Sequence, residues 1–146
     1  MKKGLWLTAA LFCSVLTVRA QSPELTKAVL KNNAPAAEAL LSAGANPNAA
    51  VQIVPGFPTT YLITAATNNS LDLVRLLLSH KAQVNQPDAF KGTALMAAVG
   101  KANKAMVDLL LSSGADVRAK DDDGNDALAK ESGNKEIIAL LEQKLK

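Results

Sequence analysis

The chain contains a single histidine, His80, which is the first residue to consider for acid–base chemistry. A histidine acts as a general base when a nucleophile and an orienting acid lie within hydrogen-bond reach. No glycine-rich loop or nucleophile motif accompanies His80 in the sequence. We therefore interpret it as a solvated residue near the end of a helix, where the helix dipole favours a cation. The sequence predicts no catalytic residue and no enzyme activity.

The acidic run DDDGND, which starts at Asp121, invites comparison with a calcium-binding loop. With Gly124 at the sixth position of an EF-hand loop, Asp121 and Asp123 fall on the third and fifth positions. The first and twelfth positions, which need ligands, are then Ala119 and Lys130. One histidine and one cysteine also leave zinc almost without ligands. We therefore expect no metal or cofactor, and interpret the run as a turn or, alternatively, as a negative patch for a basic partner.

The first 20 residues have the pattern of a secretory signal peptide. Two lysines precede the uncharged apolar run LWLTAALFCSVLTV, and small residues then lead to Ala20, after which we expect cleavage. A permanent membrane anchor is the alternative, but this run of 14 residues is shorter than the ~20 that span a bilayer. A lipoprotein signal is disfavoured, because Phe12 rather than a small residue precedes Cys13.

Cleavage after residue 20 would change what the composition implies. The chain has 16 basic residues; Lys2, Lys3 and Arg19 would leave, so 13 would remain against 13 acidic residues. A neutral mature chain gives no reason to expect nucleic acid as a partner. Loss of Cys13 would leave a chain without disulfides. The short lysine-pair start is of bacterial type, so we expect a periplasmic location and no membrane contact after cleavage.

One phrase occurs three times: LLSAGANPN from Leu40, LLSHKAQVN from Leu77 and LLSSGADVR from Leu110. The second and third copies are 33 residues apart, and so are the preceding segments that begin at Thr60 and Thr93. Self-similarity at such a period indicates stacked structural repeats. A single unit cannot bury its apolar face, so neighbouring units must stack to build a core.

These residues resemble the ankyrin repeat, whose pattern runs T-P-L-H-x-A-A, then a turn, then V-x-x-L-L-x-x-G-A-D-x-N. The matching residues of the two central units are Thr60, Leu62, Ala65, Ala66, Val74, Leu76, Leu77, Ala82 and Asn85, then Thr93, Leu95, Ala97, Ala98, Val107, Leu109, Leu110, Gly114, Ala115 and Asp116. The first unit keeps Leu25, Ala28, Leu40, Leu41, Gly44, Ala45, Asn46 and Asn48, and the last keeps Leu128, Gly133, Ile137, Ile138, Leu140 and Leu141.

The resemblance implies an all-α ankyrin-repeat solenoid of about four helix-turn-helix repeats with short connecting loop fingers. We place the signal peptide at residues 1–20 and the repeat domain at residues 21–146. The repeats are predicted at residues 22–49, 50–86, 87–119 and 120–146. The last unit is two residues short in its first helix and ends in a polar tail that suits a solvent-facing cap.

Individual residues predict where the helices begin and end. Thr60 and Thr93 suit helix N-caps, since a threonine hydroxyl can accept from an unpaired amide of the first turn. Gly44 and Gly114 suit left-handed C-caps. Lys81 stands where the second unit should have this glycine, and a side chain in a left-handed conformation is strained.

The loop between the first two units is lengthened and apolar. Twelve residues follow Asn48 up to Thr60, whereas eight follow Asn85 up to Thr93. The extra length falls in VQIVPGFP, and a loop that only faced solvent would not require so many apolar side chains. We interpret it as an anchor patch for a partner. The alternative is that these side chains fold back onto the stack and fill the first groove.

After signal cleavage the aromatic residues are confined to this loop, the next loop and the first turn of a helix, and the resemblance places such loops along a concave groove. Other contact positions are carried over from the family. The groove should be apolar at its N-terminal end and acidic at its C-terminal end. The predicted partner-binding residues are Ile53, Val54, Phe57, Tyr61, Thr67, Asn68, Ala89, Phe90, Lys91, Lys101, Asp122, Asp123 and Asn125.

The resemblance implies a non-enzymatic module that binds another protein through its concave face. We expect a periplasmic or envelope enzyme as partner, and a monomer when unbound. The size and compartment suggest an inhibitor, or an immunity-like protein, directed against a cell-wall hydrolase or a toxic effector. The alternative is an envelope assembly or escort factor, or a structural protein that self-associates through its apolar loop.

Overall fold

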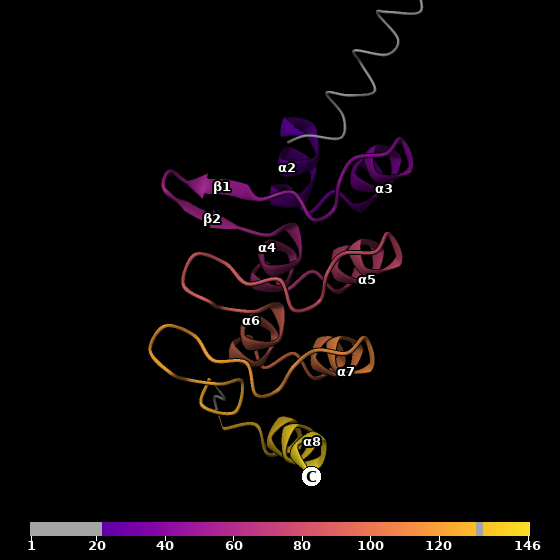
Figure 1. Ribbon diagram of the computed structural model, residues 1–146. Helices are drawn as coiled ribbons and strands as arrows, with labels where there is room; N and C mark the ends of the chain where they lie inside the picture. The colour runs from indigo at the N-terminus through magenta and orange to yellow at the C-terminus, as the bar shows by residue number, and fades with distance from the viewer. Residues whose placement is uncertain (1–21, 131–132) are drawn as a thin grey trace, which may run out of the picture.

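The computed structural model describes residues 22–130 and 133–146, so the expected signal peptide lies outside the described residues. Helices follow one another in pairs, with one short hairpin between the first two pairs (Figure 1). The elements in chain order are α2 (Pro23–Leu30), α3 (Ala34–Ser42), β1 (Val51–Val54), β2 (Phe57–Thr59), α4 (Tyr61–Thr67), α5 (Leu71–Ser79), α6 (Ala94–Gly100), α7 (Lys104–Ser112) and α8 (Lys135–Leu145).

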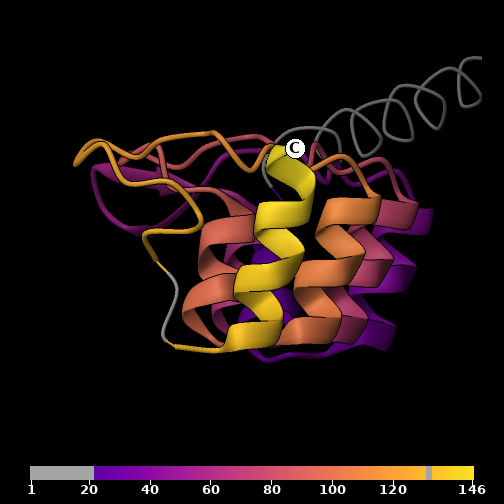
Figure 2. The same cartoon turned by 90° about the horizontal axis from the view of Figure 1, so that it is seen from below.

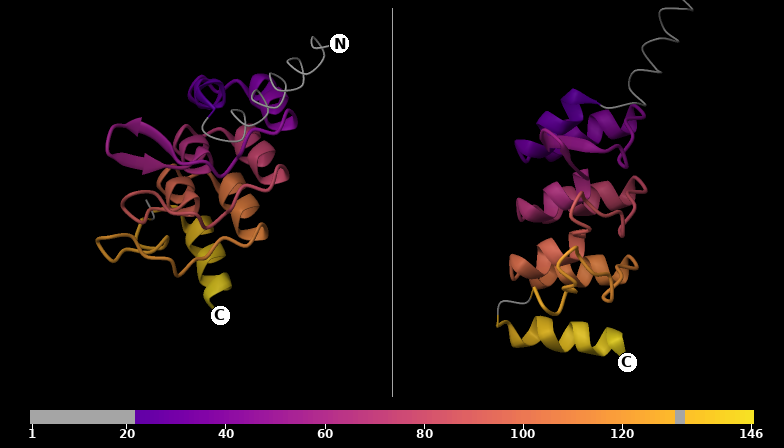
Figure 3. Two further views of the ribbon diagram at one scale, coloured as in Figure 1. Left: turned by 45° about the horizontal axis from the view of Figure 1, so that its top comes forward. Right: turned by 60° about the vertical axis from the view of Figure 1, so that its left-hand side comes forward.

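The helices form two layers. α2, α4 and α6 pack on one another in one column, and α3, α5, α7 and α8 pack in a second column beside it (Figure 1). Each helix pair makes one tier of the stack (Figure 3). The loops that connect one helix pair to the next extend past the helices on the same side (Figure 2). This arrangement confirms the predicted all-α solenoid of stacked helix-turn-helix units.

Capping threonines begin the inner helices as the sequence predicts. The Thr60 hydroxyl accepts from the Ile63 amide at 3.0 Å, and the Thr93 hydroxyl accepts from the Met96 amide at 3.3 Å. Each bond satisfies one of the amides that have no partner within the first helical turn. The caps form although neither threonine is followed by the proline and histidine of the ankyrin pattern.

Left-handed residues follow the outer helices. Gly44 and Gly114, each one residue after the C-cap, have φ angles of 100° and 91°, so the left-handed glycines predicted at the ends of these helices are confirmed. Lys81 takes the same place after α5 with a φ of 70°, which a lysine tolerates less well than a glycine. The structure therefore confirms that Lys81 adopts the left-handed conformation predicted from the sequence.

The core runs between the two helix layers. Along α5, Leu73, Val74 and Leu77 are buried, whereas Leu76 is only partly buried because it faces the outer surface. The same pattern recurs 33 residues later in α7. Alanines in the inner helices let these helices approach closely. The largest fully buried side chains are Tyr61, Leu25, Leu73, Leu77, Leu95, Met106, Leu110, Ile137, Leu141, Val29, Val74 and Val99.

The fourth unit differs from the others. Its outer helix, α8, packs on α7 and continues the outer column. The described residues 127–130 form a turn rather than a helix, and residues 131–132 lie outside the described part. Ala127 is buried and fixes this turn to the stack. No helix within residues 22–130 and 133–146 is long and apolar enough to cross a membrane.

The lengthened first loop forms a β-hairpin, which the sequence did not predict. β1 and β2 pair antiparallel, with Val51 opposite Thr59 and Val54 opposite Phe57. Pro55 and Gly56 connect the strands, and Gly56 has a φ of 86°. Proline followed by a glycine with positive φ is the signature of a type II turn. The added residues therefore build a short two-stranded projection.

Candidate functional site

Three loops project side by side from the stack and are called fingers here. The first finger is the hairpin of residues 51–59, the second is residues 86–92, and the third is residues 119–125. Hydrogen bonds connect them: the Ala89 amide donates to the Pro58 carbonyl at 2.8 Å, and the Asp122 amide donates to the Phe90 carbonyl at 3.0 Å. An ion pair between Lys91 and Asp122, with 2.9 Å between Nζ and Oδ1, joins the second finger to the third.

An aspartate shapes each of the last two fingers. The Asp88 carboxylate accepts from the amides of Phe90 and Gly92, both at 2.8 Å. Asp121, 33 residues later, accepts from the amides of Asp123 and Asn125 at 3.0 and 2.9 Å. Aspartates that accept amides two and four residues ahead hold a chain in a tight turn. The two fingers therefore have one geometry and differ in the side chains that they display.

The base of the third finger carries an ion pair. Lys130 Nζ lies 2.6 Å from Asp121 Oδ2, and the aspartate side chain is only 9% exposed. The hydrogen bond from Lys130, supported by the Asn125 amide, lowers the pKa of the Asp121 carboxyl below its usual 3.8. The same bond raises the pKa of the Lys130 ammonium above 10.5. The pair fixes the turn that follows the third finger against the groove wall.

Two phenyl rings meet between the first and second fingers. The centroids of the Phe57 and Phe90 rings are 5.2 Å apart and their planes differ by 15°, a stacked arrangement. Such pairing stabilises aromatic side chains beyond the burial of their area. Phe57 nevertheless remains 48% exposed and Phe90 55% exposed. The rings brace each other but leave much of their surface open to a partner.

A groove runs along the finger side of the inner helices. Its N-terminal half has a volume of about 400 Å³ and lies between the hairpin, the end of α2 and α4. Its C-terminal half, of about 410 Å³, lies between α4, α6 and the second and third fingers. The two halves share Ile63, Thr67, Asp88 and Phe90, so they form one continuous surface.

The apolar surface of the described residues is concentrated in this groove. Five large apolar side chains of residues 22–130 and 133–146 are exposed, and all five line the N-terminal half. They are Leu30, Ile53, Val54, Phe57 and Phe90. The hairpin side chains therefore do not fold back to fill the groove, as the alternative interpretation required.

Most of the predicted contact residues come together here. Ile53, Val54, Phe57, Thr67, Asn68 and Phe90 line the apolar half, and Asp122 and Asp123 line the other half. Ala89 and Lys91 are exposed on the second finger and bond to its two neighbours. Lys101 caps α6 outside both halves of the groove, and Asn125 serves through its backbone to close the third finger.

The prediction for Tyr61 is wrong. Its side chain is 1% exposed and packs inside the stack at the start of α4. The Tyr61 hydroxyl lies 3.2 Å from the Thr26 hydroxyl and donates to the Ser22 carbonyl at 3.3 Å. The position just after the N-cap faces the preceding repeat, so this tyrosine joins the first two repeats instead of meeting a partner.

Several groove residues were not predicted from the sequence. Leu30 occupies the same register position in α2 as Thr67 does in α4, two residues before a left-handed asparagine. This shared register is the signal in the sequence that marks Leu30 as a groove residue. Asp88, Met96 and Lys130 also line the groove, but the sequence alone does not reveal this because it depends on how the fingers fold over the inner helices.

His80 and the acidic run that starts at Asp121 have structural roles in the stack. His80 follows α5, a helix of the outer column, as its C-cap and is partly buried. Asp121 and its neighbours make the third finger, as the turn interpretation predicted. Within the described residues, no group of three or more His, Cys, Asp or Glu side chains is arranged to hold a metal ion.

Comparison with known proteins identifies the repeats. Residues 25–121 match a family model described as ankyrin repeats in three copies. A putative ankyrin repeat protein of Acanthamoeba polyphaga mimivirus is 35% identical over 77 residues, which is 51% of this chain and 11% of that protein. Ankyrin repeat and SAM domain-containing protein 6 of Rattus norvegicus is 45% identical over 73 residues, 48% of this chain and 8% of that protein.

A third similar protein, potassium channel AKT1 of Arabidopsis thaliana, is 37% identical over 87 residues, 58% of this chain and 10% of the channel. The matched segment thus covers only about a tenth of each relative, and the similarity concerns the repeats alone. Ankyrin repeats are general modules of protein–protein interaction. The repeated phrases, the stacked helix pairs and the matched family model agree: this chain belongs to the ankyrin-repeat family.

Proposed function

We propose that the chain is a non-enzymatic binding module that holds another protein in the groove between its fingers and inner helices. One observation carries the proposal: all five exposed large apolar side chains of the described residues line one half of this groove. Large apolar clusters on a protein surface mark interaction sites. Aromatic side chains near the centre of such a site contribute much of the binding energy.

The fingers are also held ready for binding. Backbone hydrogen bonds join the first finger to the second and the second to the third, and the Lys91–Asp122 ion pair supports the second connection. A surface that is already ordered loses less conformational entropy when a partner docks. The stacked phenyl rings therefore offer a rigid apolar surface whose exposed area is removed from water on binding.

A pull-down with the tagged chain tests this proposal. The double variant Phe57→Ser, Phe90→Ser removes the ring stack, while both residues are about half exposed and should be dispensable for folding. Loss of two central anchors of ~2 kcal/mol or more each should abolish capture. Circular dichroism melting of both proteins would show that the fold is retained.

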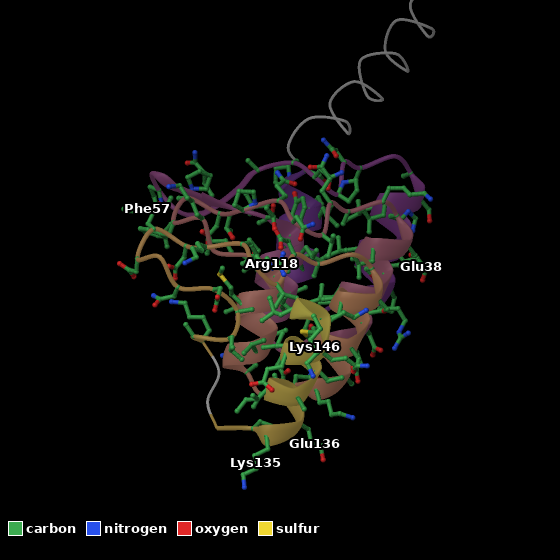
Figure 4. All side chains as sticks on the ribbon, turned by 60° about the horizontal axis from the view of Figure 1, so that its bottom comes forward. Glu38, Phe57, Arg118, Lys135, Glu136 and Lys146 are labelled. Atoms are coloured by element: carbon green, nitrogen blue, oxygen red, sulfur yellow. The ribbon has the colours of Figure 1, made fainter. Side chains whose placement is uncertain are left out.

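Glu38→Lys provides the matched control. Glu38 is an exposed residue of the outer helix α3, and Figure 4 shows it on the opposite side of the molecule from Phe57. We expect Glu38→Lys to capture the same partner as the unchanged chain. Capture that survives the double phenylalanine variant but fails with Glu38→Lys would place the interface on the outer helices and refute the proposal.

We also propose that the chain is exported, cleaved after Ala20, and acts in the periplasm as an inhibitor of a cell-wall hydrolase or a toxic effector. The basic start and the apolar run of the first 20 residues support export. Mature protein recovered from the periplasm should begin at Gln21 on N-terminal sequencing. Loss of the gene should change cell shape, lysis or sensitivity to the effector; unaltered cells would count against the inhibitory role.

A further inference from the structure

We infer that the groove accepts an extended segment of the partner protein, in which one apolar side chain and one lysine or arginine lie two to four residues apart. This inference rests on the proposed function and names the chemistry of the partner. It follows from the different character of the two halves of the groove and from the distance between them.

The apolar half determines the first requirement. Its volume of about 400 Å³ is lined by the apolar side chains of Leu30, Ile53, Val54, Phe57 and Phe90. This volume falls within the range of small-ligand pockets and is large enough for one aliphatic or aromatic side chain with its flanking backbone. An acidic side chain placed here would lose hydration beside the Asp88 carboxylate without gaining an opposite charge.

The acidic half determines the second requirement. Four carboxylates, those of Asp88, Asp121, Asp122 and Asp123, line it. Lys130 neutralises Asp121 and Lys91 neutralises Asp122. Among the described residues, neither Asp88 nor Asp123 has a lysine or arginine nitrogen within 4.0 Å. The groove therefore has two carboxylates without a cation beside its apolar end, and a basic side chain of the partner complements them.

The spacing follows from the stack. The two halves are centred on neighbouring tiers, and packed helices lie about 8–10 Å apart. An extended chain advances about 3.3 Å per residue. Roughly three residues therefore separate the side chain in the apolar half from the side chain beside Asp123. A helical segment advances only about 1.5 Å per residue and would need about six residues to cover the same distance, so the spacing distinguishes the two conformations.

The test is selection of a displayed random decapeptide library on the purified chain. Enriched peptides should carry an aromatic or aliphatic residue with a lysine or arginine two to four positions away. Enrichment of peptides without a basic residue, or with an acidic residue at that spacing, would overturn the inference. So would the absence of any enriched sequence.

Variants then assign the two halves, with the consensus peptide as the probe in fluorescence polarisation. Phe57→Ser should weaken its binding about thirtyfold. Asp123→Lys, which alters an exposed carboxylate that makes no hydrogen bond among the described residues, should weaken it about fivefold to tenfold. Glu38→Lys makes the same charge change outside the groove and should leave the affinity unaltered. An equal response to both charge reversals would refute a local acidic contact.

The outcomes separate this inference from the proposed function. If the pull-down partner is lost with Phe57→Ser, Phe90→Ser but the library yields no apolar-basic motif, the groove binds a folded surface and the inference fails alone. If neither the partner nor the peptide depends on these phenylalanines, the proposed function fails as well.

Discussion

Lys81 occupies a left-handed backbone position that other units of the stack give to Gly44 and Gly114. We predict that Lys81→Gly raises the free energy of unfolding by about 1 kcal/mol, because the left-handed strain exceeds the entropy that glycine adds to the unfolded chain. Urea denaturation measures the difference. Gly114→Lys is the reciprocal variant and should destabilise; a lowered midpoint for Lys81→Gly would contradict the backbone assignment.

We predict that the Asp121–Lys130 ion pair makes the stability of the fold depend on pH. The folded-state pKa of Asp121 is lowered, so the pair contributes stability above the unfolded pKa of about 3.9. This contribution is lost as the pH falls through the lower folded-state pKa. Carboxyl NMR should give a midpoint for Asp121 below 3.8, and Lys130→Met should move it upward. An unaltered midpoint in the variant would show that Lys130 is not the main cause.

At the level of single residues, sequence reasoning predicts some positions well. The caps at Thr60 and Thr93 and the strain at Lys81 depend on local backbone geometry, which sequence spacing determines. Whether a side chain is exposed depends instead on how the neighbouring repeats pack against it. The prediction for Tyr61 is wrong because a residue beside a helix N-cap can face either the finger or the preceding repeat. Here the Tyr61 hydroxyl donates to the Ser22 carbonyl and lies 3.2 Å from the Thr26 hydroxyl inside the stack.

The elements are joined by asparagines that connect one tier to the next. Asn85 Nδ2 donates to the Gly114 carbonyl at 3.0 Å, and its Oδ1 accepts from the Asp116 amide at 2.8 Å. Asn85→Ala removes both bonds and should lower the free energy of unfolding by about 1–2 kcal/mol. The nearby exposed Gln83, whose backbone rather than side chain is used, offers Gln83→Ala as a control with little expected effect. Equal midpoints for the two variants would refute the role of Asn85.

The first finger is an addition to the stack rather than a part of its core. Apart from Val51, the hairpin residues 51–58 are exposed. Deleting residues 53–56 restores the loop length of the second finger. We expect the deletion variant to stay folded, with a free energy of unfolding within about 1 kcal/mol of the parent, since little buried apolar area is lost. It should fail to capture the partner in the pull-down, and loss of cooperative unfolding would show instead that the hairpin supports the fold.

The sequence predicted the helices more completely than the connections. Apolar residues at helical spacing and a 33-residue period define α4 to α7 and their tiers. The sequence did not predict the hairpin because residues 51–54 become a strand only by pairing with β2 across the Pro55–Gly56 turn. The second finger supports β2 through the hydrogen bond that the Ala89 amide donates to the Pro58 carbonyl. The turn at residues 127–130 reflects the two residues missing from the last unit.

At the scale of the whole molecule, the repeated segments form the stacked helices, and the residues that differ between repeats define the binding surface. The core extends through every tier and consists largely of the apolar residues that the repeats share. The exposed apolar side chains come from the hairpin, the second finger and the end of α2, where the units differ most. The frame could therefore be predicted from one sequence, whereas the groove needed the relative positions of three fingers.

Hydrogen–deuterium exchange of the chain with and without its captured partner shows directly whether the groove is the binding site. We expect slower amide exchange on binding in the hairpin residues 51–59 and in the second finger, residues 86–92. Exchange in the outer helices α3, α5 and α7 should stay the same. Protection confined to those outer helices, with no effect on the fingers, would contradict the claim that the groove is the binding site.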